Sequence, residues 1–239
     1  MRALLWLLLA GCGRLGFGDV PTGSDATQGN DASGLGPTHQ YSLNGSYADD
    51  FGGPPLVGQG GTFVAGGYRF GANQGFTLDA AMPRTVYTVD LEFAFDKLGG
   101  WQKILDFESL GPDTGFYSYD TGLQYVIVGG TDFMTTEPRL RPGVVARVTS
   151  TRNAAGKVSL YVNGLLARGA RATMPAPPNQ PSTMFEFDDT VPVAALTSDR
   201  AYFFMDDAAT GSSEAGTGVV RRIRIWDIAL SAAQVASSP

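Results

Sequence analysis

Apolar and polar side chains alternate at every second position in several short stretches of this chain. The clearest stretch is Val86–Phe95, in which a period of two continues for ten residues. This is the period of a β-strand that buries one face. We expect one face, directed to a core, to carry Tyr87, Val89, Leu91, Phe93 and Phe95. The opposite face would then carry Thr88, Asp90, Glu92 and Ala94.

Residues 157–163 repeat the alternation. Val158, Leu160 and Val162 are expected to point inward, and Lys157, Ser159 and Tyr161 outward. The stretch ends in Asn163-Gly164, two residues that tolerate positive φ, so it predicts a tight hairpin.

Further short strands are expected between turns rich in Gly and Pro, of which the chain has 32 and 14. They are 40–43, 67–70, 75–78, 101–107, 115–119, 123–128, 144–151, 184–187, 202–205 and 219–226. Between them there is no helical periodicity, and only Ser231–Ser237 suggests a short helix, with Ser231 as its N-cap. The pattern predicts an all-β fold, an antiparallel β-sandwich with a short C-terminal helix.

Three segments, taken in order, resemble the laminin G-like, concanavalin A-like jelly-roll superfamily in its bacterial secreted branch. They are Trp101–Phe107 with Asp113–Tyr117 and Leu123–Tyr125; Gly156–Gly164; and Phe203–Asp207 with Glu214 and Gly218–Ser231. The resemblance covers roughly residues 39–238 and implies two packed antiparallel sheets. Many members bind carbohydrate or protein, often with Ca²⁺, and some proteins of the same fold are glycosidases. The fold does not determine which of these functions applies.

The N-terminus predicts export. Met1-Arg2 is followed by an apolar run, Ala3–Leu9, which is too short to cross a bilayer and has the length of a signal-peptide core. Leu9-Ala10-Gly11-Cys12 resembles the bacterial lipobox, in which the Cys is lipidated and becomes the mature N-terminus. The alternative is an ordinary signal peptide with an incidental Cys.

The resulting division of the chain has three parts. Residues 1–11 would be a lipoprotein signal peptide, residues 12–38 the lipidated end and a flexible tether, and residues 39–239 the sandwich domain. We expect a protein held in the bacterial cell envelope, at the outer membrane or the cell surface, through lipid on Cys12. Membrane contact would be through this lipid only.

Composition excludes several function classes. The chain has one Cys, so no disulfide can form within it, and one His, which argues against zinc sites built on His and against Ser-His-Asp triads. A net charge of −6 argues against nucleic acid as a partner. No P-loop, dinucleotide fingerprint or nucleophile elbow occurs.

An acidic loop is a candidate calcium site. Asp206, Asp207 and Glu214 lie within nine residues of one another in a turn that contains Gly and Ser. Ca²⁺ prefers several hard oxygen ligands, which carboxylates and loop carbonyls provide. The alternative is a structural turn whose carboxylates accept hydrogen bonds from backbone N–H groups or pair with Arg221 or Arg222. No other cofactor is expected.

Lys103 falls within an apolar stretch and needs a partner. Alternation places it on the face of Trp101, Leu105 and Phe107, and places Asp106 on the opposite face. Asp113, across a turn, is the expected partner in a structural ion pair, and ligand contact is the alternative.

Glu186 and Asp188 resemble part of the Glu-x-Asp-x-x-Glu pattern of laminarinase-type glycosidases. In that pattern two carboxyl groups on one strand supply the nucleophile and the acid/base. Val191 occupies the position of the second Glu, so the pair is incomplete.

Other candidate contacts are aromatic or basic. Sugar stacking is an alternative to core packing for the aromatic residues of the first segment, and the arginines of the last strand are expected to be charges on the sheet surface. The aromatic residues are Trp101, Phe116, Tyr117, Tyr119 and Tyr125, and the arginines are Arg221, Arg222 and Arg224.

The expectation for function is a non-catalytic binding domain, not an enzyme, whose partner is a glycan or a protein. The alternatives are a polysaccharide-degrading glycosidase of the same fold and a purely structural envelope protein.

Overall fold

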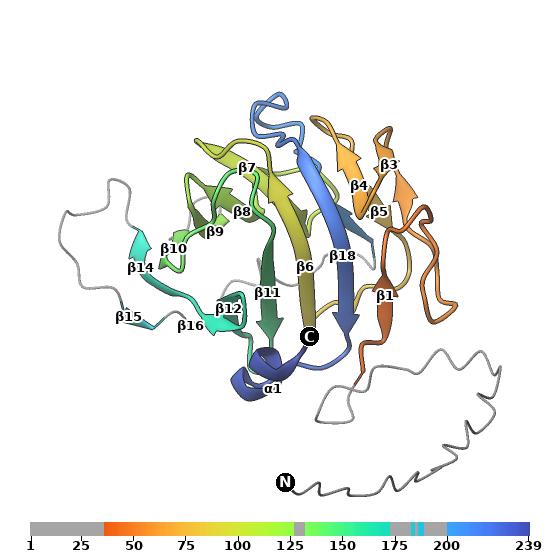
Figure 1. The fold of residues 1–239 in the computed structure, drawn as a ribbon. Coiled ribbons are helices and arrows are strands. Elements are labelled where there is room, and N and C mark those ends of the chain that lie inside the picture. Colours follow the sequence, from red (N-terminus) through yellow and green to blue (C-terminus); the bar gives the residue numbers. More distant parts are fainter. Residues whose placement is uncertain (1–35, 127–131, 173–182, 185, 189–199) are drawn as a thin grey trace, which may run out of the picture.

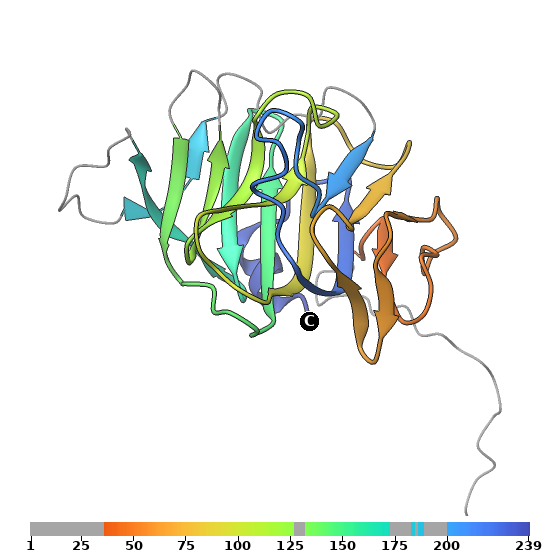
Figure 2. The same ribbon diagram turned by 90° about the horizontal axis from the view of Figure 1, so that it is seen from above.

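A computed structural model describes residues 36–126, 132–172, 183–184, 186–188 and 200–239. In these residues two antiparallel sheets pack face to face, and the two layers are visible from above in Figure 2. One short helix, α1, follows near the C-terminus. The predicted fold class, an all-β antiparallel sandwich with a short C-terminal helix, is confirmed.

The first sheet, sheet A, faces the viewer in Figure 1. Its order is β13-β12-β11-β6-β18-β4-β3, with β1 paired to β18 and β16 paired to β12. The strands are β1 (His39–Tyr41), β3 (Thr62–Val64), β4 (Gly67–Phe70), β6 (Tyr87–Phe95), β11 (Ala146–Arg152), β12 (Lys157–Val162), β13 (Leu165–Leu166), β16 (Glu186–Asp188) and β18 (Gly218–Trp226).

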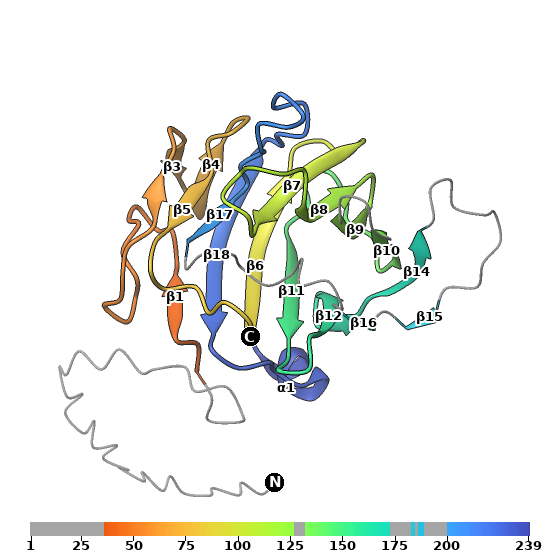
Figure 3. The ribbon, with the colours of Figure 1, turned by 180° about the vertical axis from the view of Figure 1, so that it is seen from behind.

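The second sheet, sheet B, lies in front when the molecule is seen from behind in Figure 3. Its order is β15-β14-β10-β9-β8-β7-β17-β5-β2. The strands are β2 (Val57–Gly58), β5 (Phe76–Leu78), β7 (Trp101–Asp106), β8 (Gly115–Tyr119), β9 (Gly122–Val126), β10 (Asp132–Glu137), β14 (Arg168–Ala172), β15 (Thr183–Met184) and β17 (Ala201–Phe203).

The core between the sheets contains the inward residues that alternation predicts. The apolar face of β6 is buried, and Val158, Leu160 and Val162 of β12 and Ile225 of β18 are completely buried. In sheet B, Phe116 and Tyr125 are stacked in the same core, with ring centroids 4.8 Å apart. Because apolar burial is the main favourable term in folding, these residues hold the two layers together.

The prediction that β6 is buried on one side only is wrong. Its outward residues Thr88 and Asp90 are 0% and 2% exposed. The reason is that polar partners cover them. Asp90 pairs with Arg224 at 3.0 Å, and the backbone of Ile228 accepts a hydrogen bond from Thr88 Oγ1. Sequence alternation identifies which residues share a face but not whether a polar face is covered.

The C-terminal segment covers the outer face of sheet A. Helix α1 (Ala232–Ser237) begins at the predicted N-cap, Ser231, in a capping box with Gln234. A second apolar cluster lies beneath it, formed by Tyr161, Trp226, Leu230 and Val235. Tyr161, expected to point outward to solvent, is therefore buried.

The predicted hairpin at Asn163-Gly164 joins β12 and β13, and both residues have positive φ, 52° and 78°. The structure contains strands that the sequence pattern did not predict, among them β2, β3, β10 and β14. Over the described residues, no helix is long and apolar enough to span a membrane. The predicted signal peptide, Cys12 and most of the tether lie outside the described residues, so that division of the chain stays a prediction.

Candidate functional site

A β-bulge in β7 places Lys103 on the outer face of sheet B. Lys103 pairs in register with Tyr117 of β8, whereas Leu105 pairs with Phe116, so the register shifts at Ile104 between them. As a consequence Ile104 and Leu105 both lie in the core, while Lys103 contacts the outer residue Tyr117. The prediction that Lys103 shares a face with Leu105 and lies opposite Asp106 is wrong, because a bulge breaks the period of two.

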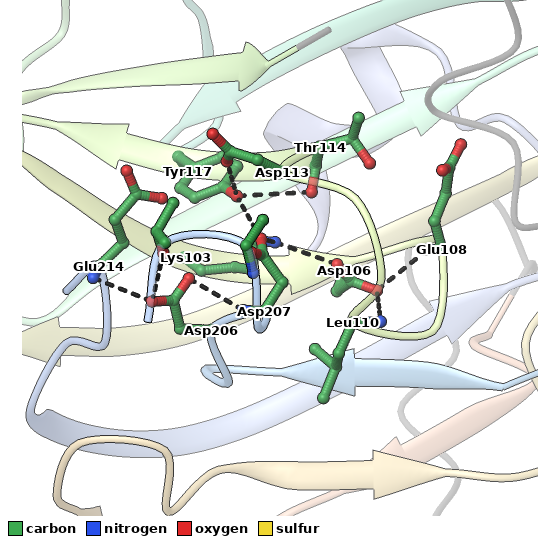
Figure 4. A network of polar contacts seen from close by, with 12 residues as sticks. Lys103, Asp106, Glu108, Leu110, Asp113, Thr114, Tyr117, Asp206, Asp207 and Glu214 are labelled. Carbon is green, nitrogen blue, oxygen red and sulfur yellow. Dashed lines mark hydrogen bonds and ion pairs between the residues drawn. The ribbon is translucent and has the colours of Figure 1, made fainter. Parts of the chain in front are cut away.

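The loop after β17 folds over this face, as Figure 4 shows. It leaves sheet B at Phe204 and returns beside β7, where the carbonyl of Glu214 accepts a hydrogen bond from the Lys103 N–H at 3.0 Å. The side chain of Asp206 closes the loop by accepting hydrogen bonds from the N–H groups of Asp207 and Glu214 at 2.9 Å each. The carboxylates thus cap backbone amides, as the structural alternative predicted.

Lys103 is completely buried between two carboxylates. Its Nζ lies 3.0 Å from Asp106 Oδ2 and also pairs with Asp207, and the three side chains are 0% exposed. Asp106 accepts two further hydrogen bonds, from the N–H groups of Glu108 and Leu110. Lys103 does form the predicted structural ion pair, but its partners are Asp106 and Asp207, and the predicted partner Asp113 is not one of them.

Tyr117 joins the ion pair to the outer carboxyl Asp113. Its hydroxyl donates to Asp113 Oδ1 at 3.1 Å and lies 3.3 Å from Asp207 Oδ2. Burial, followed by the negative charges of Asp113, Asp207 and Glu214, raises the pKa of Tyr117 far above its usual range. The phenol is therefore a hydrogen-bond donor at every physiological pH.

Glu214 is the carboxyl group with the most unusual environment. Its Oε2 is buried and has no hydrogen-bond partner in the described structure. Burial, with the nearby charges of Asp113, Asp206 and Asp207, raises the pKa of Glu214 to about 7, and Lys103 offsets this only in part. Glu214 therefore changes between a neutral and an ionised form near neutral pH, a property common at functional sites.

Two aromatic side chains lie beside this cluster. Trp101 and Tyr119 pair across β7 and β8, with ring centroids 4.5 Å apart, and both are partly exposed. The Trp101 ring also contacts Tyr117 edge-on at 5.8 Å. Trp101, Tyr117 and Tyr119 lie on the outer face, whereas Phe116 and Tyr125 of the predicted aromatic set belong to the core.

Calcium binding by Asp206, Asp207 and Glu214 stays a prediction. The three residues lie in one loop, but the carboxylate of Asp206 is directed to backbone amides and that of Asp207 to Lys103. Among the described residues, no group of three or more His, Cys, Asp or Glu side chains is arranged to hold a metal ion.

The carboxylates considered for glycosidase chemistry lie elsewhere. Glu186 and Asp188 belong to β16, which pairs with β12 in sheet A, whereas Val191 lies outside the described residues.

The arginines of β18 differ from one another. Arg221 is exposed, Arg222 pairs with Glu92, and Arg224 is 3% exposed in its pair with Asp90. The prediction of three surface charges is therefore wrong for Arg224, because the C-terminal segment covers that part of the sheet.

No family model matches the chain, and no curated protein matches it either. Membership of the laminin G-like family therefore stays a prediction. Solved structures with a similar fold do match the chain.

Domain 4 of AbnA, a GH43 extracellular arabinanase from Geobacillus stearothermophilus, in complex with arabinotriose, has a similar fold. The TM-score is 0.56 at 15% identity, and the match covers 84% of this chain and 96% of that domain. A Trypanosoma rangeli sialidase in complex with 2,3-difluorosialic acid matches with a TM-score of 0.58 at 16% identity, over 92% of this chain and 35% of the sialidase.

A further Trypanosoma rangeli sialidase structure, in complex with the inhibitor DANA, matches with a TM-score of 0.56 at 16% identity. It is covered over 32% of its length, so the chain spans about a third of the sialidases it resembles. The neighbours are carbohydrate-active proteins, and at these identities they show the β-sandwich fold.

These neighbours correct the expectation that the chain is not an enzyme. That expectation relied on the incomplete carboxylate pair at Glu186 and Asp188 and on a resemblance to binding domains. It is wrong as an exclusion, because this fold also occurs within sialidases and an arabinanase, so the fold gives no ground for excluding catalysis.

Proposed function

We propose that the sandwich binds carbohydrate through the outer face of β7 and β8. One observation carries the proposal: the partly exposed pair of Trp101 and Tyr119 adjoins a cluster of carboxyl groups that includes Asp113 and Glu214. The arabinotriose complex of a domain with the same fold supports the ligand class.

The chemistry of the face suits a sugar. Aromatic rings provide a large, rigid apolar surface on which a sugar ring stacks, at low cost in side-chain entropy. Carboxylates accept hydrogen bonds from hydroxyl groups, and bonds to charged groups are stronger than neutral ones. The buried ion pair of Lys103 with Asp106 and Asp207 holds β7 and the loop in position, so the face is organised before a ligand arrives.

Titration of the full chain with neutral oligosaccharides, arabinotriose among them, tests this proposal by calorimetry. Trp101→Ala should weaken binding by about tenfold or more, since a central aromatic contact commonly contributes about 2 kcal/mol. Phe51→Ala is the matched control, because Phe51 is an aromatic residue in the loop after β1 whose side chain is 43% exposed. Equal binding by wild type and Trp101→Ala would place the ligand elsewhere.

A second candidate function is glycoside hydrolysis, which Glu214 and the sialidase neighbours favour. A carboxyl group whose pKa is about 7 is suited to general acid catalysis near neutral pH, and a second carboxylate, Asp113, adjoins it. Release of reducing sugar from a polysaccharide panel, and hydrolysis of a fluorogenic sialoside, measure this activity. Activity that Glu214→Gln leaves unchanged would remove Glu214 from the mechanism.

We further propose that lipid on Cys12 anchors the protein in the bacterial envelope. Support comes from the apolar run that ends in Leu9-Ala10-Gly11-Cys12. Cys12→Ala should move the protein out of the membrane fraction and abolish incorporation of labelled palmitate. A variant that stays labelled and membrane-bound would contradict the proposal.

Calcium at the Asp206–Glu214 loop is proposed on the carboxylates alone, and a thermal melt tests it. An ion that binds only the folded state stabilises that state by about 2.7 kcal/mol when the free ion concentration is a hundred times its dissociation constant. The melting temperature of the wild type should therefore be higher in millimolar Ca²⁺ than in EDTA. Equal melting temperatures would leave the loop as a structural turn.

A further inference from the structure

We propose that the sugar bound at the outer face of β7 and β8 is uncharged, and that the face rejects acidic sugars such as sialic acid and uronic acids. This inference rests on the proposed carbohydrate-binding function and specifies its ligand class. It separates this chain from a ligand named in the sialidase complexes, although the fold is shared.

The cluster beside the proposed sugar site carries more negative than positive charge. Five carboxyl groups, from β7 and the two loops that meet over it, lie in one network or act on it electrostatically. They are Asp106, Asp113, Asp206, Asp207 and Glu214. Among the described residues, Lys103 is the cation that pairs with two of them, so the ionised cluster carries an excess of negative charge. A carboxylate on the ligand would meet like charges, and such a juxtaposition at an interface is strongly unfavourable.

Lys103 is not available to pair with an acidic ligand. A site that binds an acidic sugar needs a cation that reaches the ligand, usually an arginine with two parallel donors. Lys103 cannot serve, because it is 0% exposed and its amino group is already paired with Asp106 and Asp207. Releasing it would leave two buried carboxylates without a counter-charge.

The environment of Glu214 shows that a further negative charge is unfavourable in this cluster. Its Oε2 is buried and unpartnered, and its pKa rises from 4.5 to about 7 through burial and the charges of Asp113, Asp206 and Asp207. Each unit of pKa is a factor of ten in the equilibrium between the two forms. A sugar carboxylate entering the same environment would meet part of this penalty, and we expect at least about a tenfold loss of affinity.

The hydroxyl groups of a neutral sugar avoid this penalty and gain from the same groups. Asp113 is partly exposed and has a second carboxylate oxygen besides the one that accepts from Tyr117. This oxygen is an acceptor for hydroxyl donors. Exposed carboxylate oxygens beside a lysine that is already paired therefore favour ligands that donate hydrogen bonds and carry no negative charge.

The test compares neutral sugars with acidic counterparts. Trigalacturonate and its methyl ester share rings and linkages, and lactose and 3′-sialyllactose form a second pair. Each is titrated against the full chain at about pH 7.5, where Glu214 is mostly ionised. The neutral member of a pair should bind at least about tenfold more tightly than the acidic one.

Two variants locate the cause of the discrimination. Asp113→Asn and Glu214→Gln remove negative charge from the face and should reduce the ratio of the two affinities by about threefold or more. Asp50→Asn makes the same change on an exposed residue after β1 and should leave the ratio unaltered. At about pH 5.5 Glu214 is neutral and the sugar carboxylate stays ionised, so the wild-type ratio should also fall.

The outcomes distinguish the two proposals. Equal or tighter binding of an acidic sugar at this face would overturn the inference and leave carbohydrate binding intact. A ratio that Asp113→Asn and Glu214→Gln do not change would overturn its electrostatic basis. Absence of binding to all the sugars, neutral and acidic, would overturn the proposed function and the inference together.

Discussion

Replacing Lys103 by Met should destabilise the domain strongly. Met keeps most of the side-chain volume and removes the charge, so Asp106 and Asp207 would remain with side chains 0% exposed and without a cation. Each keeps other hydrogen bonds: Asp106 from two backbone N–H groups, and Asp207 from Ala209 N–H and the Tyr117 hydroxyl. The loss is therefore of charge compensation and not of all polar contact.

The expected magnitude follows from this burial. Removing one partner of a buried ion pair costs about 3–5 kcal/mol, because the remaining charge is uncompensated.

Urea unfolding of the wild type and of Lys103→Met at about pH 7, followed by tryptophan fluorescence, measures the effect. Arg69→Met is the matched control: its pair with Asp96 has a similar separation, 2.9 Å, but the side chains are 51% and 37% exposed. Exposed pairs contribute at most about 1 kcal/mol. A loss below about 1 kcal/mol for Lys103→Met, no larger than that of Arg69→Met, would refute the argument.

Three further changes test other parts of the fold. Leu91→Ala should lower the free energy of unfolding by about 2–5 kcal/mol in a urea titration, because it leaves a cavity in the core, and a loss under about 0.5 kcal/mol would contradict this placement. Burial acts to raise the pKa of Asp49, but hydrogen bonds from His39 and backbone N–H groups outweigh it and hold that pKa below 3.8. The stability that Asp49 contributes should be complete above about pH 5 and lost as the pH falls through that lowered pKa, so the stability gap between wild type and Asp49→Asn should close in acid; a gap independent of pH would speak against it. Deleting residues 232–239 removes the carbonyl groups of Val235 and Ser238 that hold Arg147 beside Asp90, and should speed amide exchange in β6, whereas unchanged protection would show that the helix does not protect this strand.

The two-layer fold could be predicted from the sequence because its information is local. The period of two in residues 86–95 and 157–162 identifies the core faces of β6 and β12, and Asn163-Gly164 identifies a hairpin. Ser231 and Gln234 identify the start of the helix in the same way. The short edge strands β2, β3 and β13 were missed or given wrong bounds because two or three residues are too few to show a period.

The candidate site could be predicted only in part, because its contacts are far apart in the sequence. Lys103 was recognised as a buried cation in need of a partner, and the Asp206–Glu214 loop as an acidic turn. Nothing local states that the two meet, since 104 residues separate Lys103 from Asp207. The bulge at Ile104 moves Lys103 to the face opposite Leu105, and one extra residue in a strand leaves no reliable trace in its pattern.

The position of β18 has a consequence for how the chain acquires its structure during synthesis. This strand, near the end of the chain, lies between β6 and β4 in the middle of sheet A and also pairs with β1, as Figure 1 shows. A ribosome that has released everything up to residue 217 has therefore produced both neighbours of a missing central strand. Folding from the N-terminus onward cannot complete sheet A, and the edges of β4 and β6 that pair with β18 keep their backbone hydrogen-bonding groups unpaired until Gly218–Trp226 arrives. The domain should therefore acquire its stability in one step once β18 has left the ribosome, and nascent chains that end before β18 should be sensitive to protease along their whole length.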